Sequence, residues 1–260
     1  MNDGDNEGPT QGQYCPGSLA RYEWIFGADF LSSGAQETAL LAARALELGG
    51  GHSVLDVGSG FGGAAFYFAS AYGAHVTGLD VLPQMAAEAQ RRAHERRAAN
   101  VVFVCGDVLT GPLPSAPFDA VYSKDSFLHI HGKDRLMTVL FGLLAPGGRI
   151  YFSDYLRGRD RGSEEFESYV ADSAYGLAAF EGYRTAMQRA GFIDAVCEDR
   201  TDRLIEILVD DLAAIRAAKA GAAGPSGPDL DYLIARWELK LRCLRAGDMQ
   251  WGSFFARRPK

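Results

Sequence analysis

A glycine-rich loop that directly follows a short apolar strand constrains this chain more than any other feature. The segment reads VLDVGSGFGG over residues 54–63, with glycines at positions 58, 60, 62 and 63. Glycine lets a backbone turn through left-handed conformations and approach a ligand closely. A loop of this kind, between a strand and the start of a helix, is typical of nucleotide-binding α/β folds. The loop therefore predicts a nucleotide-like ligand at the carboxyl end of this strand.

The rest of the chain alternates short apolar runs with longer helical patterns. Apolar strands that are covered on both faces are typical of parallel sheets flanked by helices. The expected strands are residues 53–57, 75–80, 101–104, 120–123, 148–154, 192–198 and 249–256. The expected helices are residues 19–26, 33–48 with Ser33 as N-cap, 62–72, 83–98, two within 156–190, 202–220 and 230–244.

Length and composition suit one globular domain. The chain has 260 residues, of which 47% are hydrophobic and 23% charged, as in ordinary well-packed domains. Residues 1–13 have the composition of a disordered tail, so we expect a single domain over residues 14–260. The regions around 14–34 and 156–190 are expected to form a helical cap, and GAAGPSGP at 221–228 is the expected linker.

Charge and cysteine spacing exclude several classes of function. A net charge of −7 shows no broad basic face for nucleic acid. No uncharged apolar run reaches the length of a membrane span, and the N-terminus lacks the apolar core of a secretion signal. Four dispersed cysteines indicate reduced thiols in a cytoplasmic protein and no zinc site. We also expect a monomer, since no unused apolar face stands out. The cysteines are Cys15, Cys105, Cys197 and Cys243.

Three acidic residues at strand ends distinguish between possible ligands. Asp80 ends the second expected strand, where a carboxylate can accept from both hydroxyls of a ribose. Asp107 ends the third and can accept from an adenine amino group. Asp56, at the loop entrance, would repel a pyrophosphate but would suit a sulfonium compound that carries an ammonium group. A nicotinamide-binding Rossmann protein and a purely structural turn are the alternatives.

These segments together match a known pattern. The chain has DxGSGxG at 56–62, an acid ending the second strand, GD at 106–107 and LAPGG at 144–148. In these features it resembles the class I S-adenosylmethionine-dependent methyltransferases. The resemblance implies a Rossmann-like, seven-stranded, mostly parallel sheet with a helical cap over the active site. It also implies S-adenosylmethionine as cofactor, S-adenosylhomocysteine as its product, and no metal.

Further segments narrow the family. The chain contains QY at 13–14, YEWIFG at 22–27, FLSSG at 30–34, YSKDSFLH at 122–129, SDY at 153–155 and WG at 251–252. With these segments, at this spacing, residues 13–260 resemble the phosphoethanolamine N-methyltransferases of the single-domain, parasite type. The resemblance implies methylation of phosphoethanolamine and of its methylated forms toward phosphocholine.

The resemblance also assigns roles to residues. Tyr14 and His129 would pair across the active site as a catalytic latch, with Asp125 beside them. The cofactor contacts that the resemblance implies would be Tyr22, Leu31, Ser32, Gly58, Asp80, Val81, Asp107, Val108 and Lys124. The glycine loop itself adds Asp56 and Gly60 as expected cofactor contacts. The substrate contacts would be Gln13, Asp125, Tyr155, Tyr169, Tyr175 and Lys240.

The chemistry of methyl transfer suits these residue types. The reaction is an in-line displacement, so positioning the reactants and excluding water supply much of the catalysis. An amine of pKa about 10 must lose a proton before it attacks, and His129, or Asp125 through a water, can accept it. Tyrosine faces bind a quaternary ammonium by cation–π attraction. Lys240 supplies a point charge for an anionic group.

Each assigned residue also has an ordinary structural alternative. Tyr14 would anchor the surface beside a disordered tail, and His129 would be a structural residue after a strand. Asp125 would be an acid favoured by a helix dipole. The three tyrosines would pack under the cap, and Lys240 would lie on a solvated helix face.

One position departs from the family pattern. The resemblance places a second phosphate-binding cation, an arginine, four residues after Tyr169, where this chain has Ser173 beside Asp172. A charge-assisted hydrogen bond of this kind is worth about 1.5–3 kcal/mol, or about one to two decades of affinity. Another arginine can compensate from elsewhere in the fold. The three candidates are Arg157, Arg184 and Arg236.

Three hypotheses follow from this departure. In the first, the chain methylates phosphoethanolamine and its mono- and dimethyl forms. In the second, it methylates another small amine, oxygen or sulfur nucleophile with less anionic character. In the third, it binds the cofactor without catalysis; the retained pair of Tyr14 and His129 argues against this one.

Overall fold

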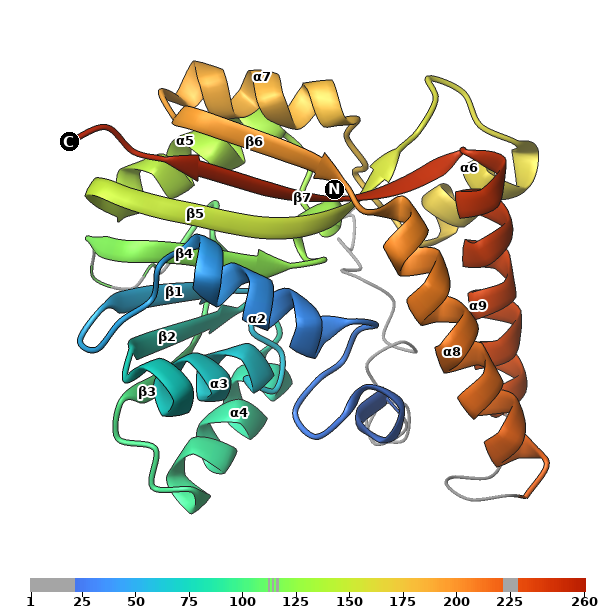
Figure 1. Ribbon diagram of the computed structural model, residues 1–260, viewed down its shortest axis with the longest axis horizontal. Helices are drawn as coiled ribbons and strands as arrows, with labels where there is room; N and C mark the ends of the chain where they lie inside the picture. Colours follow the sequence, from blue (N-terminus) through green and yellow to red (C-terminus); the bar gives the residue numbers. More distant parts are fainter. Residues whose placement is uncertain (1–21, 112, 114, 116, 222–228) are drawn as a thin grey trace, which may run out of the picture.

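Seven strands form one sheet in the order β3-β2-β1-β4-β5-β7-β6 (Figure 1). The computed structural model describes residues 22–111, 113, 115, 117–221 and 229–260. Neighbouring strands from β3 to β5 run parallel, and β7 runs antiparallel to both β5 and β6. This confirms the predicted seven-stranded, mostly parallel sheet. The strands are β1 (Ser53–Val57), β2 (His75–Asp80), β3 (Val101–Cys105), β4 (Phe118–Lys124), β5 (Leu144–Arg157), β6 (Ile193–Asp199) and β7 (Met249–Arg257).

Helices cover both faces of the sheet and its carboxyl end (Figure 1). One face packs against α2 (Ala35–Ala45), α3 (Gly63–Tyr72) and α4 (Pro83–Glu95). The other packs against α5 (Lys133–Leu143) and α7 (Phe180–Ala190). A third group lies beyond the carboxyl ends of the central strands: α6 (Glu164–Asp172), α8 (Thr201–Lys219) and α9 (Asp229–Ala246).

Two long helices, α8 and α9, build the wall of this third group. The buried side chains of α8 recur every three or four residues and so form one apolar face; they are Leu204, Leu208, Leu212, Ile215 and Ala218. The facing side chains of α9 repeat in the same way; they are Leu230, Leu233, Trp237, Leu241 and Leu244. Burial of each such leucine contributes about 1.5–3 kcal/mol. No helix in the described part of the chain is long and apolar enough to cross a membrane.

The start of α2 differs from the prediction. Ser33 was expected to cap this helix, but Gly34 is the N-cap and no side chain caps it. Ser33 Oγ instead donates to Asp211 Oδ2 at 2.6 Å. Asp211 is a largely buried carboxylate on α8, and a buried carboxylate needs donors. The expectation was wrong because the partner lies 178 residues away.

Candidate active site

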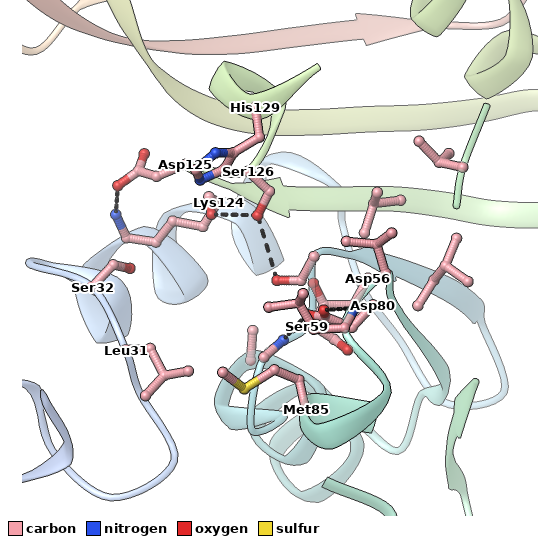
Figure 2. Close-up of a pocket in the computed structure, with 18 of the residues that line it drawn as sticks. Leu31, Ser32, Asp56, Ser59, Asp80, Met85, Lys124, Asp125, Ser126 and His129 are labelled. Atoms are coloured by element: carbon pink, nitrogen blue, oxygen red, sulfur yellow. Dashed lines mark hydrogen bonds and ion pairs between the residues drawn. The ribbon is translucent and has the colours of Figure 1, made fainter. Parts of the chain in front are cut away.

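A pocket of about 490 Å³ opens at the carboxyl ends of β1, β2 and β4 (Figure 2). It lies where the strand order reverses between β1 and β4, the usual ligand position in open α/β sheets. Ten of the residues predicted to contact the cofactor line it: Leu31, Ser32, Asp56, Gly58, Gly60, Asp80, Val81, Asp107, Val108 and Lys124. The catalytic candidates Asp125 and His129 line the same pocket.

The glycine loop needs glycine for steric reasons. Gly58 has a φ of 74°, and a Cβ atom there would lie 2.1 Å from Ser126 Oγ. Gly62 has a φ of 87°, and its Cβ would lie 2.3 Å from the Phe103 ring. A side chain at either position would clash and would strain the backbone. The loop is therefore held close to β4 and β3, which leaves its backbone exposed to the pocket.

Asp80 has a fixed orientation at the end of β2. Its two carboxylate oxygens accept hydrogen bonds from the backbone N–H groups of Gly60, at 2.9 Å, and Leu82, at 3.0 Å. Burial raises the pKa of Asp80, and these two backbone hydrogen bonds oppose that rise. Each oxygen keeps a lone pair, so the carboxylate can accept from the two hydroxyls of a ribose.

Asp56 is a buried carboxyl group in the same pocket (Figure 2). Burial, with a smaller contribution from Asp80, raises its pKa to about 8. A cation beside it would favour the charged form. The site therefore suits a ligand with a positive charge.

Ser59 Oγ, close by in the loop, is buried and has no hydrogen-bond partner among the described residues. No pattern in the sequence pointed to this unsatisfied hydroxyl.

Asp107 lies two residues beyond the end of β3, which stops at Cys105, one residue after the predicted bound at Val104. Its carboxylate accepts from Leu109 N at 2.7 Å and from Thr110 Oγ1 at 3.0 Å. These contacts fix the turn that carries Val108 into the pocket wall. An adenine ring can lie against this turn.

Asp125 sits at the centre of a polar cluster, in the left-handed backbone region with a φ of 48°. Its Oδ2 atom lies 2.5 Å from Lys124 Nζ. Its Oδ1 atom accepts from Ser153 Oγ at 2.9 Å and from Trp251 Nε1 at 2.8 Å. A non-glycine residue in this conformation costs free energy and persists where its surroundings fix it. These contacts, more than a helix dipole, account for the position of the carboxylate.

His129 ends a single 3-10 turn (Phe127–His129) after β4. Burial, followed by the charges of Lys133 and Arg236, lowers its pKa to about 4, so the ring is neutral at pH 7. Asp154 holds this turn in place. Its Oδ1 atom accepts from Leu128 N at 3.1 Å, and Tyr183 OH donates to its carboxylate at 2.5 Å. A fixed turn gives the imidazole a fixed place at the pocket edge.

Beyond His129 lies a group of side chains that we call the tyrosine–cation cluster. It contains Tyr155, Tyr169, Tyr175, Arg236 and Lys240. Lys240 Nζ lies 3.4 Å from Tyr155 OH and 4.9 Å from the centre of that ring. The ring centres of Tyr169 and Tyr175 are 5.6 Å apart, and Tyr175 meets His129 edge to face at 5.2 Å.

The cluster thus brings together four of the predicted substrate residues, from β5, α6, the segment after α6, and α9. None of the four lines the cofactor pocket itself. His129 joins the two regions, because it lines the pocket and also touches Tyr175.

Arg236 is the arginine that the fold brings to this cluster. Its Nη2 atom donates to Tyr175 OH at 2.9 Å, and its guanidinium lies 5.2 Å from the Tyr169 ring centre. The other two candidates are elsewhere. Arg157 forms a two-point ion pair with Glu167, at 2.6 and 3.0 Å, and the half-exposed Arg184 lies 3.6 Å from Glu181.

Other predicted residues have different positions. Tyr22 does not line the cofactor pocket: it is buried and stacks on Phe26, with ring centres 5.8 Å apart. Phe26 in turn stacks on Trp237 of α9 at 5.8 Å. Gln13 and Tyr14 lie outside the described residues. Within those residues, no three His, Cys, Asp or Glu side chains are arranged to hold a metal ion.

Comparison with known proteins agrees with this geometry. The family described as "Methyltransferase domain" matches residues 54–148. The phosphoethanolamine N-methyltransferase of Plasmodium falciparum is 32% identical over 201 residues, which span 75% of this chain and 74% of that protein. The chain belongs to the phosphoethanolamine N-methyltransferase family.

Longer members of the phosphoethanolamine N-methyltransferase family match as well. One from Triticum aestivum is 39% identical over 243 residues, or 93% of this chain and 48% of that protein. The chain thus spans about half the length of the plant relatives. A structure of Haemonchus contortus phosphoethanolamine N-methyltransferase 2 has a TM-score of 0.89 and 33% identity over 95% of this chain and 58% of that one. It was determined with phosphomonomethylethanolamine and S-adenosylhomocysteine bound.

Proposed function

We propose that this chain transfers methyl groups from S-adenosylmethionine to the nitrogen of phosphoethanolamine and of its mono- and dimethyl forms, toward phosphocholine. One observation carries the proposal: His129 joins a pocket lined by fixed carboxylates to a cluster of tyrosines and cations. The first region suits a nucleoside with a cationic tail, and the second suits an ammonium and a phosphate. The names of the relatives agree with both halves.

The residues of the pocket fit S-adenosylmethionine. Asp80 would accept from the ribose hydroxyls, and the turn at Asp107 and Val108 would hold the adenine. Asp56 and the unsatisfied Ser59 Oγ would face the charged amino-acid tail, which carries an ammonium group. When bound, this cofactor supplies a methyl group on a positively charged sulfur.

The chain's own residues would position the acceptor and remove its proton. Aromatic faces of the tyrosine–cation cluster attract the methylated ammonium, and Lys240 attracts the phosphate. A primary amine must become neutral before it attacks, and the neutral His129 ring can accept a hydrogen bond or a proton from it. Asp125 would act on the amine directly or through a water, and Tyr14 would close over His129.

One observation favours a second candidate, a methyltransferase for a less anionic acceptor. Ser173 ends α6 beside the tyrosine–cation cluster, in place of the family's arginine, and the neighbouring Asp172 is negative. A phosphate there would lack one partner and meet one repulsive charge.

Turnover of S-adenosylmethionine to S-adenosylhomocysteine distinguishes the two candidates. The acceptors to compare are phosphoethanolamine, ethanolamine and their methylated forms. Product confined to the phosphorylated series supports the proposal. If none of these acceptors yields S-adenosylhomocysteine while the cofactor still binds, the proposal is contradicted and the second candidate is favoured.

We further propose that residues 14–260 act as one domain with a helical cap, as a monomer in the cytoplasm. The three described cysteines, Cys105, Cys197 and Cys243, are free thiols, which agrees with a reducing compartment. The net charge of −7 argues against a nucleic-acid partner. Light scattering after size-exclusion chromatography tests the monomer directly.

A further inference from the structure

Arg236 and Lys240 lie four residues apart on α9, so their side chains share one face of the helix. Both reach into the tyrosine–cation cluster. We propose that Arg236 and Lys240 together clamp the phosphate of the acceptor, with Arg236 supplying from α9 the guanidinium that α6 lacks at Ser173. This inference rests on the proposed function and names the residue that would restore its missing cation.

The first argument is position. Ser173 lies four residues after Tyr169 and two before Tyr175, so a long side chain at 173 would reach these two tyrosines. Arg236 contacts the same pair, donating to Tyr175 OH at 2.9 Å and lying over the Tyr169 ring at 5.2 Å. A guanidinium from either helix would therefore occupy the same part of the cluster.

The second argument is the shape of the group. An arginine presents several N–H donors in a planar fork that matches two phosphate oxygens, whereas a lysine supplies a compact point charge. Arg236 Nη2 points at Tyr175 OH, and Lys240 Nζ points at Tyr155 OH. Tyr175 therefore lies beside one cation and Tyr155 beside the other, and both phenol hydroxyls can donate to an anion bound between the cations.

The third argument is charge. Two cations held one helical turn apart and half-buried repel each other, and a dianion between them would relieve that repulsion. Burial, followed by the charge of Arg236, lowers the pKa of Lys240 to about 7, and Lys124 makes a smaller contribution in the same direction. The nearby carboxylates Asp125 and Asp211 act in the opposite direction.

Neither carboxylate contacts Lys240 directly. Asp125 is engaged by Lys124, Ser153 and Trp251. Asp211 accepts from Ser33 Oγ at 2.6 Å and from Trp237 Nε1 at 3.3 Å. Within the described residues, neither forms an ion pair with Lys240. An anionic ligand would supply a negative charge in direct contact with Lys240.

The test compares Arg236→Gln, Ser173→Arg and the double variant. Arg236→Gln should raise the Kd for phosphoethanolamine, measured calorimetrically in the presence of S-adenosylhomocysteine, about 10- to 100-fold. The Kd for S-adenosylhomocysteine alone should change less than about threefold. Adding Ser173→Arg to Arg236→Gln should recover most of the loss, because it places a guanidinium at the same tyrosines from α6.

Two further variants keep the test decisive. Arg242→Gln is the matched control, because Arg242 lies on the same helix and pairs with Glu165 at the surface; its affinities should match wild type. Arg236→Lys keeps the charge but not the fork, and should lose about 3- to 10-fold. Circular dichroism reports whether each variant folds. If Arg236→Gln does not fold, the affinity of Arg236→Lys is used to test the proposal.

The failure of this inference differs from the failure of the proposed function. If wild type methylates phosphoethanolamine and the Arg236 variants bind it as tightly as wild type does, the clamp is wrong and the function stands. If wild type methylates no phosphorylated amine and binds none, both are wrong. If wild type methylates none but binds phosphocholine, and Arg236→Gln loses that binding, the clamp stands without the function.

Discussion

The cofactor pocket and the tyrosine–cation cluster are built in different ways. The pocket comes from residues that follow directly on strand ends, and the backbone fixes them: Asp80 is held by two N–H groups from its own neighbourhood. The cluster is assembled from β5, α6, the segment after α6 and α9, and the hydrogen bonds of its two cations join side chains 61 and 85 positions apart. The pocket therefore depends on the strands themselves, whereas our proposal for the cluster is that α9 supplies a cation that α6 lacks.

The largest expected effect comes from removing the side chain of His129, which lies in the pocket and also contacts the cluster. His129→Ala should lower kcat by about 10²- to 10⁴-fold if, as proposed, the imidazole orients and deprotonates the amine. The Kd for S-adenosylmethionine should change little. Steady-state kinetics and calorimetry measure the two effects. His94→Ala, on the exposed side of α4, is the control. Equal losses in turnover and in cofactor binding would contradict this role.

A smaller effect is expected from damage to the pocket alone. Asp80→Ala removes a carboxylate and leaves the N–H groups of Gly60 and Leu82 without their partner. The Kd for S-adenosylmethionine should rise about 10- to 100-fold, while binding of phosphocholine should be affected much less. Calorimetric titration with each ligand checks the separation. Unchanged cofactor binding would mean that the ribose lies elsewhere.

A different kind of effect, on stability and not on turnover, is a dependence on pH that belongs to the pocket. The pKa of Asp56 is about 8 in the fold, against an ordinary value of 3.8. The folded chain therefore holds a proton that the unfolded chain releases, and the resulting stabilisation is lost as the pH rises from about 4 to 8. Asp56→Asn should flatten the free energy of unfolding over this range.

The same group links cofactor binding to protons. An ammonium beside Asp56 lowers its pKa, so S-adenosylmethionine should bind more tightly as the pH rises toward 8, with release of a proton. Calorimetry in two buffers of different ionisation enthalpy counts that proton. Release of the same proton by the Asp56→Asn variant would contradict the assignment.

Local signals made the pocket predictable from the sequence. Asp56 lies in β1, Asp80 ends β2, and Asp107 follows β3 by two residues. These acids and the glycine loop are thus placed by adjacent strands, and ten of the residues predicted to contact the cofactor line one pocket. The cap of α2 was not predictable in this way. Ser33 has the right residue type for a cap, but its hydroxyl donates instead to the half-buried Asp211 on α8.

The cluster was only partly predictable. Its tyrosines and Lys240 came from the family resemblance, and the spacing of Arg236 and Lys240 indicates a shared helix face. The choice of Arg236 over Arg157 and Arg184 depends on how α9 packs against α6, which no local pattern encodes. The left-handed backbone conformation of Asp125 could not be predicted from the local sequence either, because the side chains that contact it, Ser153 and Trp251, come from β5 and β7.

The central claim is that this site selects a phosphorylated amine. The most direct measurement is the ratio of kcat/KM for phosphoethanolamine to kcat/KM for ethanolamine under the same conditions. Two charge-assisted contacts of about 1.5–3 kcal/mol each predict a ratio of about 10² to 10⁴. A ratio near one, or a preference for ethanolamine, would contradict the claim.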